Sequence, residues 1–164
     1  MAQQLFWEDV EVGSEITPLP RIATTLMLVK WAGAFGDFNP LHYEEAFAAK
    51  QMIGKPIVHG ALKRAWLTTL MTNWIGDNGT LKKLSCQYRA MDWPRGMKTL
   101  YEPEEGDTWW CKGKVTNKYL KDGEHYVDCE IWVENAKGEK TTPGAATAVL
   151  PSRGKLGWGT KRLT

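Results

Sequence analysis

The longest helical pattern in the chain runs from about Val58 to Ile75 and is apolar on nearly every side. Its apolar positions are Leu62, Ala65, Trp66, Leu67, Leu70, Met71, Trp74 and Ile75, and its polar positions concentrate at Lys63 and Arg64. A surface helix keeps one broad polar face, so a helix with this pattern belongs in the interior of a protein. Gly76 follows the last apolar position and is a suitable helix end. The pattern therefore predicts a buried helix.

After Gly79 the apolar positions recur with a period of two, which is typical of half-buried strands. Four such segments cover residues 84–90, 109–115, 125–133 and about 145–150. Asp122-Gly123 and Lys137-Gly138 separate the last three segments and favour tight hairpin turns between antiparallel neighbours. A long apolar helix followed by an antiparallel meander predicts an α+β fold, with the sheet wrapped around the helix.

The amino-terminal part of the chain predicts shorter elements. Residues 3–16 form an acidic lead-in, and the prolines of residues 17–20 (TPLP) predict a break in regular structure. A helix is expected to begin at Thr24 or Thr25 and to run to about Phe35.

A turn is predicted after this helix, between Gly36 and a second short helix over residues 43–50. Asn39 precedes a proline and favours an extended backbone, and Asn-Pro suits the first two positions of a type I turn. On a continuous helix, side chains five residues apart would point about 140° away from each other. A turn can instead bring Asp37 and His42 towards one point.

Asp37, Asn39 and His42 put a carboxylate, an amide and an imidazole on this turn. Together they are the groups needed to hold and deprotonate a water molecule. The spacing by itself favours a structural alternative, in which Asp37 caps a helix, Asn39 bonds its own turn and His42 is partly buried.

A second candidate site is His59-Gly60, at the start of the apolar helix. Free backbone N–H groups at a helix start favour negative charge, so Gly60 could donate a hydrogen bond to an oxygen that gains charge during a reaction. The alternative is a glycine required for helix packing. We expect a structural role for His59, because a side chain beside a helix start has many local backbone partners.

Composition narrows the class of protein. The chain has 164 residues, 43% of them hydrophobic and 24% charged, which fits one domain (residues 1–150) with an irregular tail over residues 151–164. The net charge of +2 is spread along the chain, which argues against nucleic acid as the main ligand.

Three distant cysteines without a CxxC motif favour neither disulfides nor a zinc site, and a reducing cytoplasm is the expected compartment. We also expect neither an export signal nor a membrane span.

Three stretches in the first half of the chain form a motif. They are Gly36-Asp37-Phe38-Asn39-Pro40-Leu41-His42, Ala46-Phe47-Ala48-Ala49 and Lys55-Pro56-Ile57-Val58-His59-Gly60. Together they resemble the hydratase motif of the MaoC-like, (R)-specific enoyl-CoA hydratase family, most densely over residues 31–62. Tyr88-Arg89-Ala90, followed by Trp93-Pro94, is similar to that family's strand after the central helix.

This resemblance implies a hot-dog fold and reversible hydration of trans-2-enoyl thioesters to 3-hydroxyacyl thioesters. Asp37 would take a proton from the water that attacks C3, and His42 would hold that water and assist proton delivery to C2. Asn39 would orient both groups, and the N–H of Gly60 would stabilise charge on the thioester oxygen. The resemblance implies no metal and no redox cofactor, with coenzyme A present only as part of an acyl-CoA substrate. It also implies a homodimer or larger homo-oligomer.

The chain departs from the family pattern after Trp93-Pro94. Residues 95–105 look like an insertion before Gly106-Asp107-Thr108, and they could reshape or cover an acyl pocket. Arg89, Arg95 and Lys112 are candidates to bind coenzyme A phosphates, although a solvated strand face explains them equally well.

Three other functions stay open from the sequence. A dehydratase could act on acyl-carrier protein instead of coenzyme A. A non-catalytic partner subunit or acyl-binding module could share the fold, although retention of both Asp37 and His42 argues against it. Thioester hydrolysis also occurs among related hot-dog proteins, but the turn fits hydration better.

Overall fold

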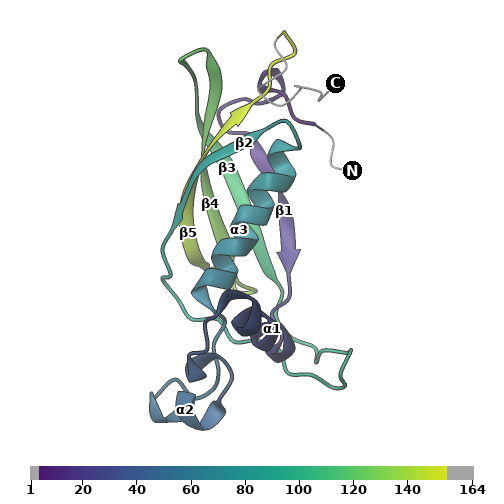
Figure 1. Cartoon of the computed structure of the whole chain (residues 1–164), viewed down its shortest axis with the longest axis vertical. Coiled ribbons are helices and arrows are strands. Elements are labelled where there is room, and N and C mark those ends of the chain that lie inside the picture. The colour runs from purple at the N-terminus through teal and green to yellow at the C-terminus, as the bar shows by residue number, and fades with distance from the viewer. Residues whose placement is uncertain (1–3, 155–164) are drawn as a thin grey trace.

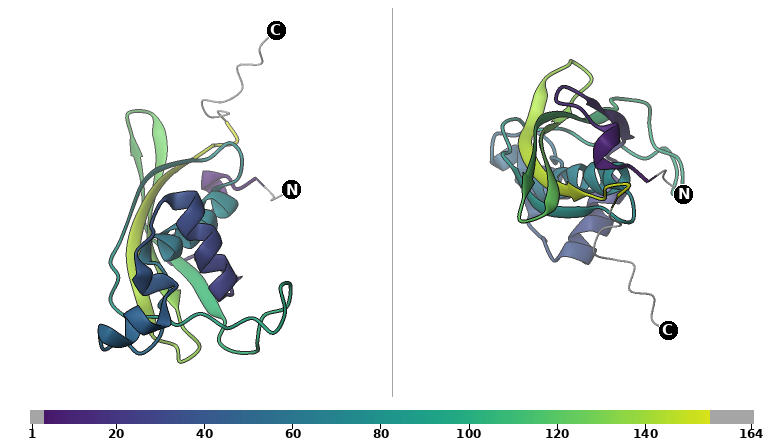
Figure 2. Two further views of the ribbon diagram at one scale, coloured as in Figure 1. Left: turned by 60° about the horizontal axis from the view of Figure 1, so that its bottom comes forward. Right: turned by 90° about the horizontal axis from the view of Figure 1, so that it is seen from above.

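The computed structural model describes residues 4–154. One long helix, α3 (Gly60–Ile75), crosses the face of a five-stranded antiparallel sheet, and the sheet curls around it (Figures 1 and 2). The strands are β1 (Glu15–Arg21), β2 (Thr80–Cys86), β3 (Trp109–Lys121), β4 (Glu124–Glu134) and β5 (Lys140–Leu150), in the spatial order β1-β3-β4-β5-β2. The predicted α+β architecture is confirmed.

The core lies between α3 and the inward face of the sheet. On the helix it contains Leu62, Trp66, Leu67, Leu70, Met71 and Ile75, all buried. On the sheet the alternate residues of β3, β4 and β5 are buried, as their period of two predicts: Trp109, Cys111, Val115, Val127, Cys129, Ile131, Val133, Ala146, Ala148 and Leu150. Burial of these side chains is the main favourable term that holds the sheet on the helix.

Two predicted features of the sheet are wrong. The prolines of residues 17–20 do not break the chain, because β1 is an edge strand that pairs with β3 through a register shift between Ile16 and Leu19. An edge strand tolerates prolines, since the missing N–H costs no central ladder bond. The strand expected over residues 84–90 ends at Cys86, and it pairs with β5 at the far edge, not with β3 as a simple meander would require.

The hairpin turns form where the sequence predicts them. Asp122 and Gly123 have φ values of 52° and 78°, and Gly138 has 80°. A turn with two residues at positive φ matches the right-handed twist of the flanking strands, which explains the Asp-Gly pair between β3 and β4.

The remaining helices lie at the end of α3 that carries Gly60 (Figure 1). They are α1 (Thr25–Phe35) and α2 (Glu45–Lys50), together with the short 3-10 helix η2 (Pro40–His42). A further 3-10 helix, η1 (Trp7–Asp9), precedes β1. Helix α1 begins as predicted, because the Thr24 hydroxyl accepts a hydrogen bond from the Met27 N–H at 3.0 Å.

Residues 95–105 form a small hairpin that projects from the body of the protein beyond α1 (Figures 1 and 2). Backbone hydrogen bonds join Lys98 to Glu102 and Glu104 to Gly96. The guanidinium of Arg95 closes the base by donating to the carbonyls of Gly106 and Asp107.

The predicted tail over residues 151–164 lies outside the described residues from position 155 onwards. No helix within residues 4–154 is long and apolar enough to cross a membrane. Cys86, Cys111 and Cys129 are free thiols. Burial raises the pKa of Cys111 and of Cys129 to about 12, so both behave as inert core side chains.

Candidate functional site

The site begins with the turn after α1. Gly36 ends that helix at a φ of 79°, which lets the chain reverse direction at once. The side-chain oxygen of Asn39 accepts a hydrogen bond from the Leu41 N–H at 3.1 Å, and the His42 N–H donates to the Asn39 carbonyl. The Asn39 amide oxygen is thus used inside the turn, as in the structural alternative for this residue.

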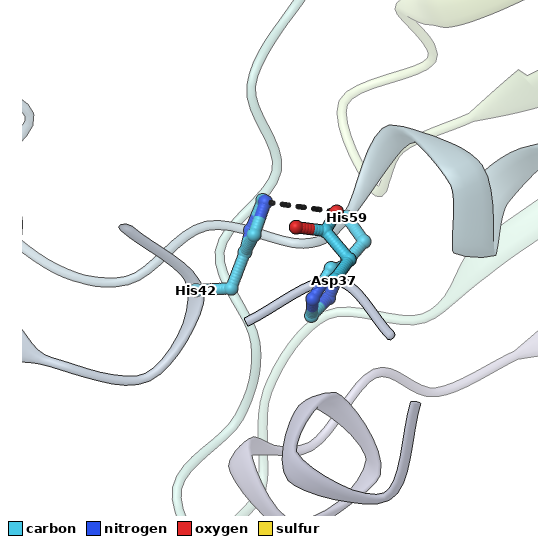
Figure 3. A group of neighbouring side chains, drawn as sticks. All are labelled: Asp37, His42 and His59. Atoms are coloured by element: carbon cyan, nitrogen blue, oxygen red, sulfur yellow. Dashed lines mark ion pairs between the residues drawn. The ribbon is translucent and has the colours of Figure 1, made fainter. Parts of the chain in front are cut away.

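This turn brings Asp37 and His42 together, as the sequence predicts. The His42 Nε2 atom lies 4.0 Å from Asp37 Oδ2 (Figure 3). The other ring nitrogen, Nδ1, lies 2.8 Å from the carbonyl oxygen of Ile57. A carbonyl only accepts, so Nδ1 carries the hydrogen, and in the neutral ring Nε2 presents its lone pair towards Asp37.

His59 joins this pair from the start of α3. Its ring stacks on that of His42, with the ring centres 3.7 Å apart and the planes 21° from parallel. The side chain is fully buried, and neither ring nitrogen has a hydrogen-bond partner within residues 4–154. The expected local backbone partners of His59 are therefore absent from the described structure, and its neighbour is a candidate catalytic side chain. Burial, and then the nearby charge of His42, lower the pKa of His59, so this ring is neutral near pH 7.

One ligand atom from each of Asp37, His42 and His59 lies within 4.8 Å of the others. This is short enough to ask whether the three hold a metal ion. Imidazole lone pairs lie in the ring plane, and two stacked rings direct them along nearly parallel planes. A single ion close to the rings would lie outside at least one of these planes, so binding one would require the rings to turn from the observed stack.

Gly60 is the first residue of α3, beside these side chains. The first N–H groups of a helix have no partner within the helix and carry partial positive charge. A Cβ at position 60 would lie 2.7 Å from the ring of Tyr88. A side chain at position 60 would thus displace either the start of α3 or the Tyr88 ring, which approaches from the segment after β2.

A cavity of about 330 Å³ opens at this point. It is lined by His42, Ile57, Val58, Gly60, Lys63, Tyr88, Arg89, Ala90 and Met91. His42, at the end of the predicted turn, therefore lines one cavity together with Gly60 and residues 88–91. The hairpin over residues 95–105 lies against a different cavity, next to Lys55 and Pro56.

The three side chains that are candidates to bind coenzyme A phosphates occupy different environments. Arg89 is exposed and lines the cavity beside His42. The Lys112 Nζ atom pairs with Glu134 at 2.6 Å, and Arg95 closes the hairpin described above. Among the three, the structure places Arg89 beside the turn.

Sequence reasoning missed a buried ion pair under the site. Lys63, expected on the polar part of α3, is only 2% exposed and lies 2.6 Å from the carboxylate of Asp92, which is 3% exposed. Lys63 Nζ also donates to the Ala90 carbonyl at 3.0 Å. The Asp92 carbonyl accepts from the Val58 N–H, so this pair ties residues 90–92 to the start of α3. The partners are 29 residues apart, and no local pattern signals their pairing.

A curled antiparallel sheet around one buried helix defines the hot-dog class of folds, and here the helix starts beside an Asp/His turn. The sequence model of the MaoC-like domain matches residues 11–94, just over half of the chain, and the chain belongs to this family.

Known proteins agree with this assignment. The (R)-specific enoyl-CoA hydratase of Aeromonas caviae is 31% identical over 74 residues, which cover 45% of this chain and 54% of that protein. The match thus spans about half the length of that relative. Two solved structures share the fold. An (R)-hydratase from A. caviae has a TM-score of 0.73 at 23% identity, covering 88% of this chain and 99% of that one. The hydratase PhaJ1 from Pseudomonas aeruginosa has a TM-score of 0.76 at 22% identity, covering 98% and 94%.

Proposed function

We propose that this protein catalyses the reversible hydration of trans-2-enoyl thioesters, with acyl-CoA as the substrate. The observation that carries this proposal is the 4.0 Å separation between His42 Nε2 and Asp37 Oδ2. The two atoms are too far apart for a direct hydrogen bond. Two hydrogen bonds of about 2.8 Å span that distance when they meet at about 90°, so one water molecule can donate to both atoms. Its oxygen lone pairs then stay free to attack carbon.

In the proposed reaction the water oxygen bonds to C3 of the enoyl group. The π electrons of the C2–C3 double bond move onto the thioester carbonyl oxygen, and the N–H of Gly60 stabilises the charge that develops there. The proton that leaves the water passes to the Asp37/His42 pair and then from this pair to C2. The net change is addition of H and OH across the double bond, which requires no metal and no redox cofactor.

The substrate is proposed to enter through the cavity lined by Gly60 and Tyr88, where Arg89 at the rim is the candidate for contact with the carrier phosphates. Asn39 is proposed to act indirectly, by fixing the turn that sets the spacing of Asp37 and His42. The homo-oligomer expected from the resemblance belongs to this proposal.

The test is loss of enoyl-thioester absorbance when the purified protein is added to crotonyl-CoA and to longer trans-2-enoyl-CoAs. We expect turnover by the parent protein and a fall of about a hundredfold or more in kcat for Asp37→Asn and for His42→Ala. No turnover of any chain length by the folded parent would reject hydration of simple enoyl-CoAs. Release of free thiol, followed with a chromogenic thiol reagent, would instead indicate thioester hydrolysis.

A further inference from the structure

His59 occupies its buried position at a cost. An imidazole has two polar nitrogens, and both are removed from water here without a hydrogen bond of normal geometry within residues 4–154, although the Asp37 backbone lies close enough to oppose the lowering of the ring's pKa. Phenylalanine would fill a similar volume without that cost. The presence of a buried ring at residue 59 is therefore better explained by the side chain that the ring contacts than by hydrogen bonds of its nitrogens.

The ring of His59 contacts the face of His42. The ring centres are 3.7 Å apart, so the two imidazoles stack over most of their area. At one edge, His42 is held by the hydrogen bond from Nδ1 to the Ile57 carbonyl. A single hydrogen bond fixes one atom but permits the ring to tilt about it. A flat neighbour on the ring face removes that freedom.

The direction of Nε2 depends on both constraints. In the proposed reaction the lone pair of this atom must point at the water held between His42 and Asp37, and a tilt of the ring moves the lone pair away from that position. Small losses of alignment at reacting atoms lower catalytic rates strongly. Both constraints come from residues 57–59, which lead directly into α3 and Gly60.

We infer that His59 is a positioning residue for the hydration proposed above: its buried ring stacks on His42 and holds the Nε2 lone pair towards Asp37. The planar ring is the operative feature, and the ring nitrogens of His59 take no part in proton transfer. This inference rests on the proposed function for its kinetic consequence, but the orientation of His42 can be measured without any substrate.

The kinetic test compares a planar with a non-planar replacement of similar volume. We expect His59→Phe to keep kcat within about threefold of the parent and His59→Leu to lower kcat about tenfold or more, with KM changed less than about threefold in both. A role limited to filling space would give both variants the same kcat. If His59→Leu does not fold, His59→Met supplies the non-planar side chain.

Tyr119→Leu provides the matched control. It removes one ring from the stacked Tyr119–Tyr126 pair on β3 and β4, and neither tyrosine lines the cavity beside His42. We expect this variant to keep the kcat of the parent. That result would show that a fall in kcat in His59→Leu does not follow from the loss of just any aromatic stack.

The structural test uses the ring nitrogen chemical shifts of His42 in 15N-labelled protein, which report which nitrogen carries the hydrogen. We expect the Nδ1–H form to dominate in the parent and in His59→Phe, and a mixture of the two neutral forms in His59→Leu, because a ring without its flat neighbour tilts far enough to weaken the hydrogen bond from Nδ1 to the Ile57 carbonyl. An unchanged Nδ1–H population in His59→Leu would overturn the inference. Loss of kcat in His59→Phe equal to that in His59→Leu would also overturn it, because the nitrogens would then be essential.

A parent without hydratase activity would reject the proposed function, and the nitrogen shifts would still decide the positioning role.

Discussion

Gly60 meets a packing constraint at the same place where the proposed reaction needs an N–H donor. The ring of Tyr88 lies where a side chain at position 60 would begin, since three of its ring carbons lie within 2.8 Å of the point that a Cβ would occupy. The same close approach places the first N–H groups of α3 against the cavity wall that residues 88–91 form. The packing and functional alternatives for this glycine are therefore compatible.

We predict that Gly60→Ala lowers kcat/KM by about tenfold or more, because either the Tyr88 ring or the start of α3 must move and so misplace the N–H donor. Gly33→Ala in α1 is the matched control, since a Cβ there meets nothing within 4 Å. That variant should keep full activity and gain up to about 1 kcal/mol in helix stability. The steady-state kinetics of both variants check this, and equal activities would contradict it.

At the scale of elements, the Lys63–Asp92 pair connects α3 to the segment after β2. Both side chains are almost fully buried, and the pair acts together with the Val58 to Asp92 backbone hydrogen bond. Removal of one member of a buried pair leaves an uncompensated charge, whereas apolar replacement of both members is often neutral.

Lys63→Met should therefore lower the free energy of unfolding by about 3–5 kcal/mol, and the double variant Lys63→Met/Asp92→Leu should recover most of this loss. Lys82→Met is the control, because its pair with Glu124 is 38% and 37% exposed and should contribute little to stability. Urea unfolding at pH 7 measures all three variants. Equal destabilisation by the single and the double variant would count against a buried-charge effect.

At the scale of the whole molecule, the buried histidine couples stability to pH. The pKa of His59 in the folded protein is lowered by burial and by the charge of His42, with opposing contributions from Asp37. The unfolded chain therefore binds a proton at this residue more readily than the folded protein does. The stability that neutral His59 provides is present above its unfolded pKa of about 6.5 and is lost as pH falls towards the folded value.

We predict that the free energy of unfolding falls more steeply between pH 7.5 and about 5.5 in the parent than in His59→Phe, because phenylalanine removes this one titration. Urea unfolding of both proteins at several pH values provides the comparison. Other titrating groups are common to both, so the difference in slope reports residue 59 together with its coupling to His42. Parallel curves would show that burial of His59 does not couple stability to pH.

Several elements follow from local physical chemistry and were predicted from the sequence. The period of the apolar positions predicted α3 and the buried faces of β3 to β5, because a helix or strand repeats its contacts every few residues. Proline and glycine chemistry predicted the Asp37–His42 turn and the Asp122-Gly123 hairpin. These features depend on neighbours along the chain.

Tertiary structure decided the features that depend on distant residues. The prolines of β1 are compatible with a strand because β1 lies at one edge of the sheet, with β3 as its neighbour among the described strands. The partner of Lys63 and the stack of His59 on His42 join segments whose separation in the chain carries no periodic signal. The sequence by itself determined α3, the strands β3 to β5 and the Asp37–His42 turn, through local preference and periodicity. The order of the strands and the surroundings of that turn were decided by which surfaces pack together, and packing is settled only by the folded chain.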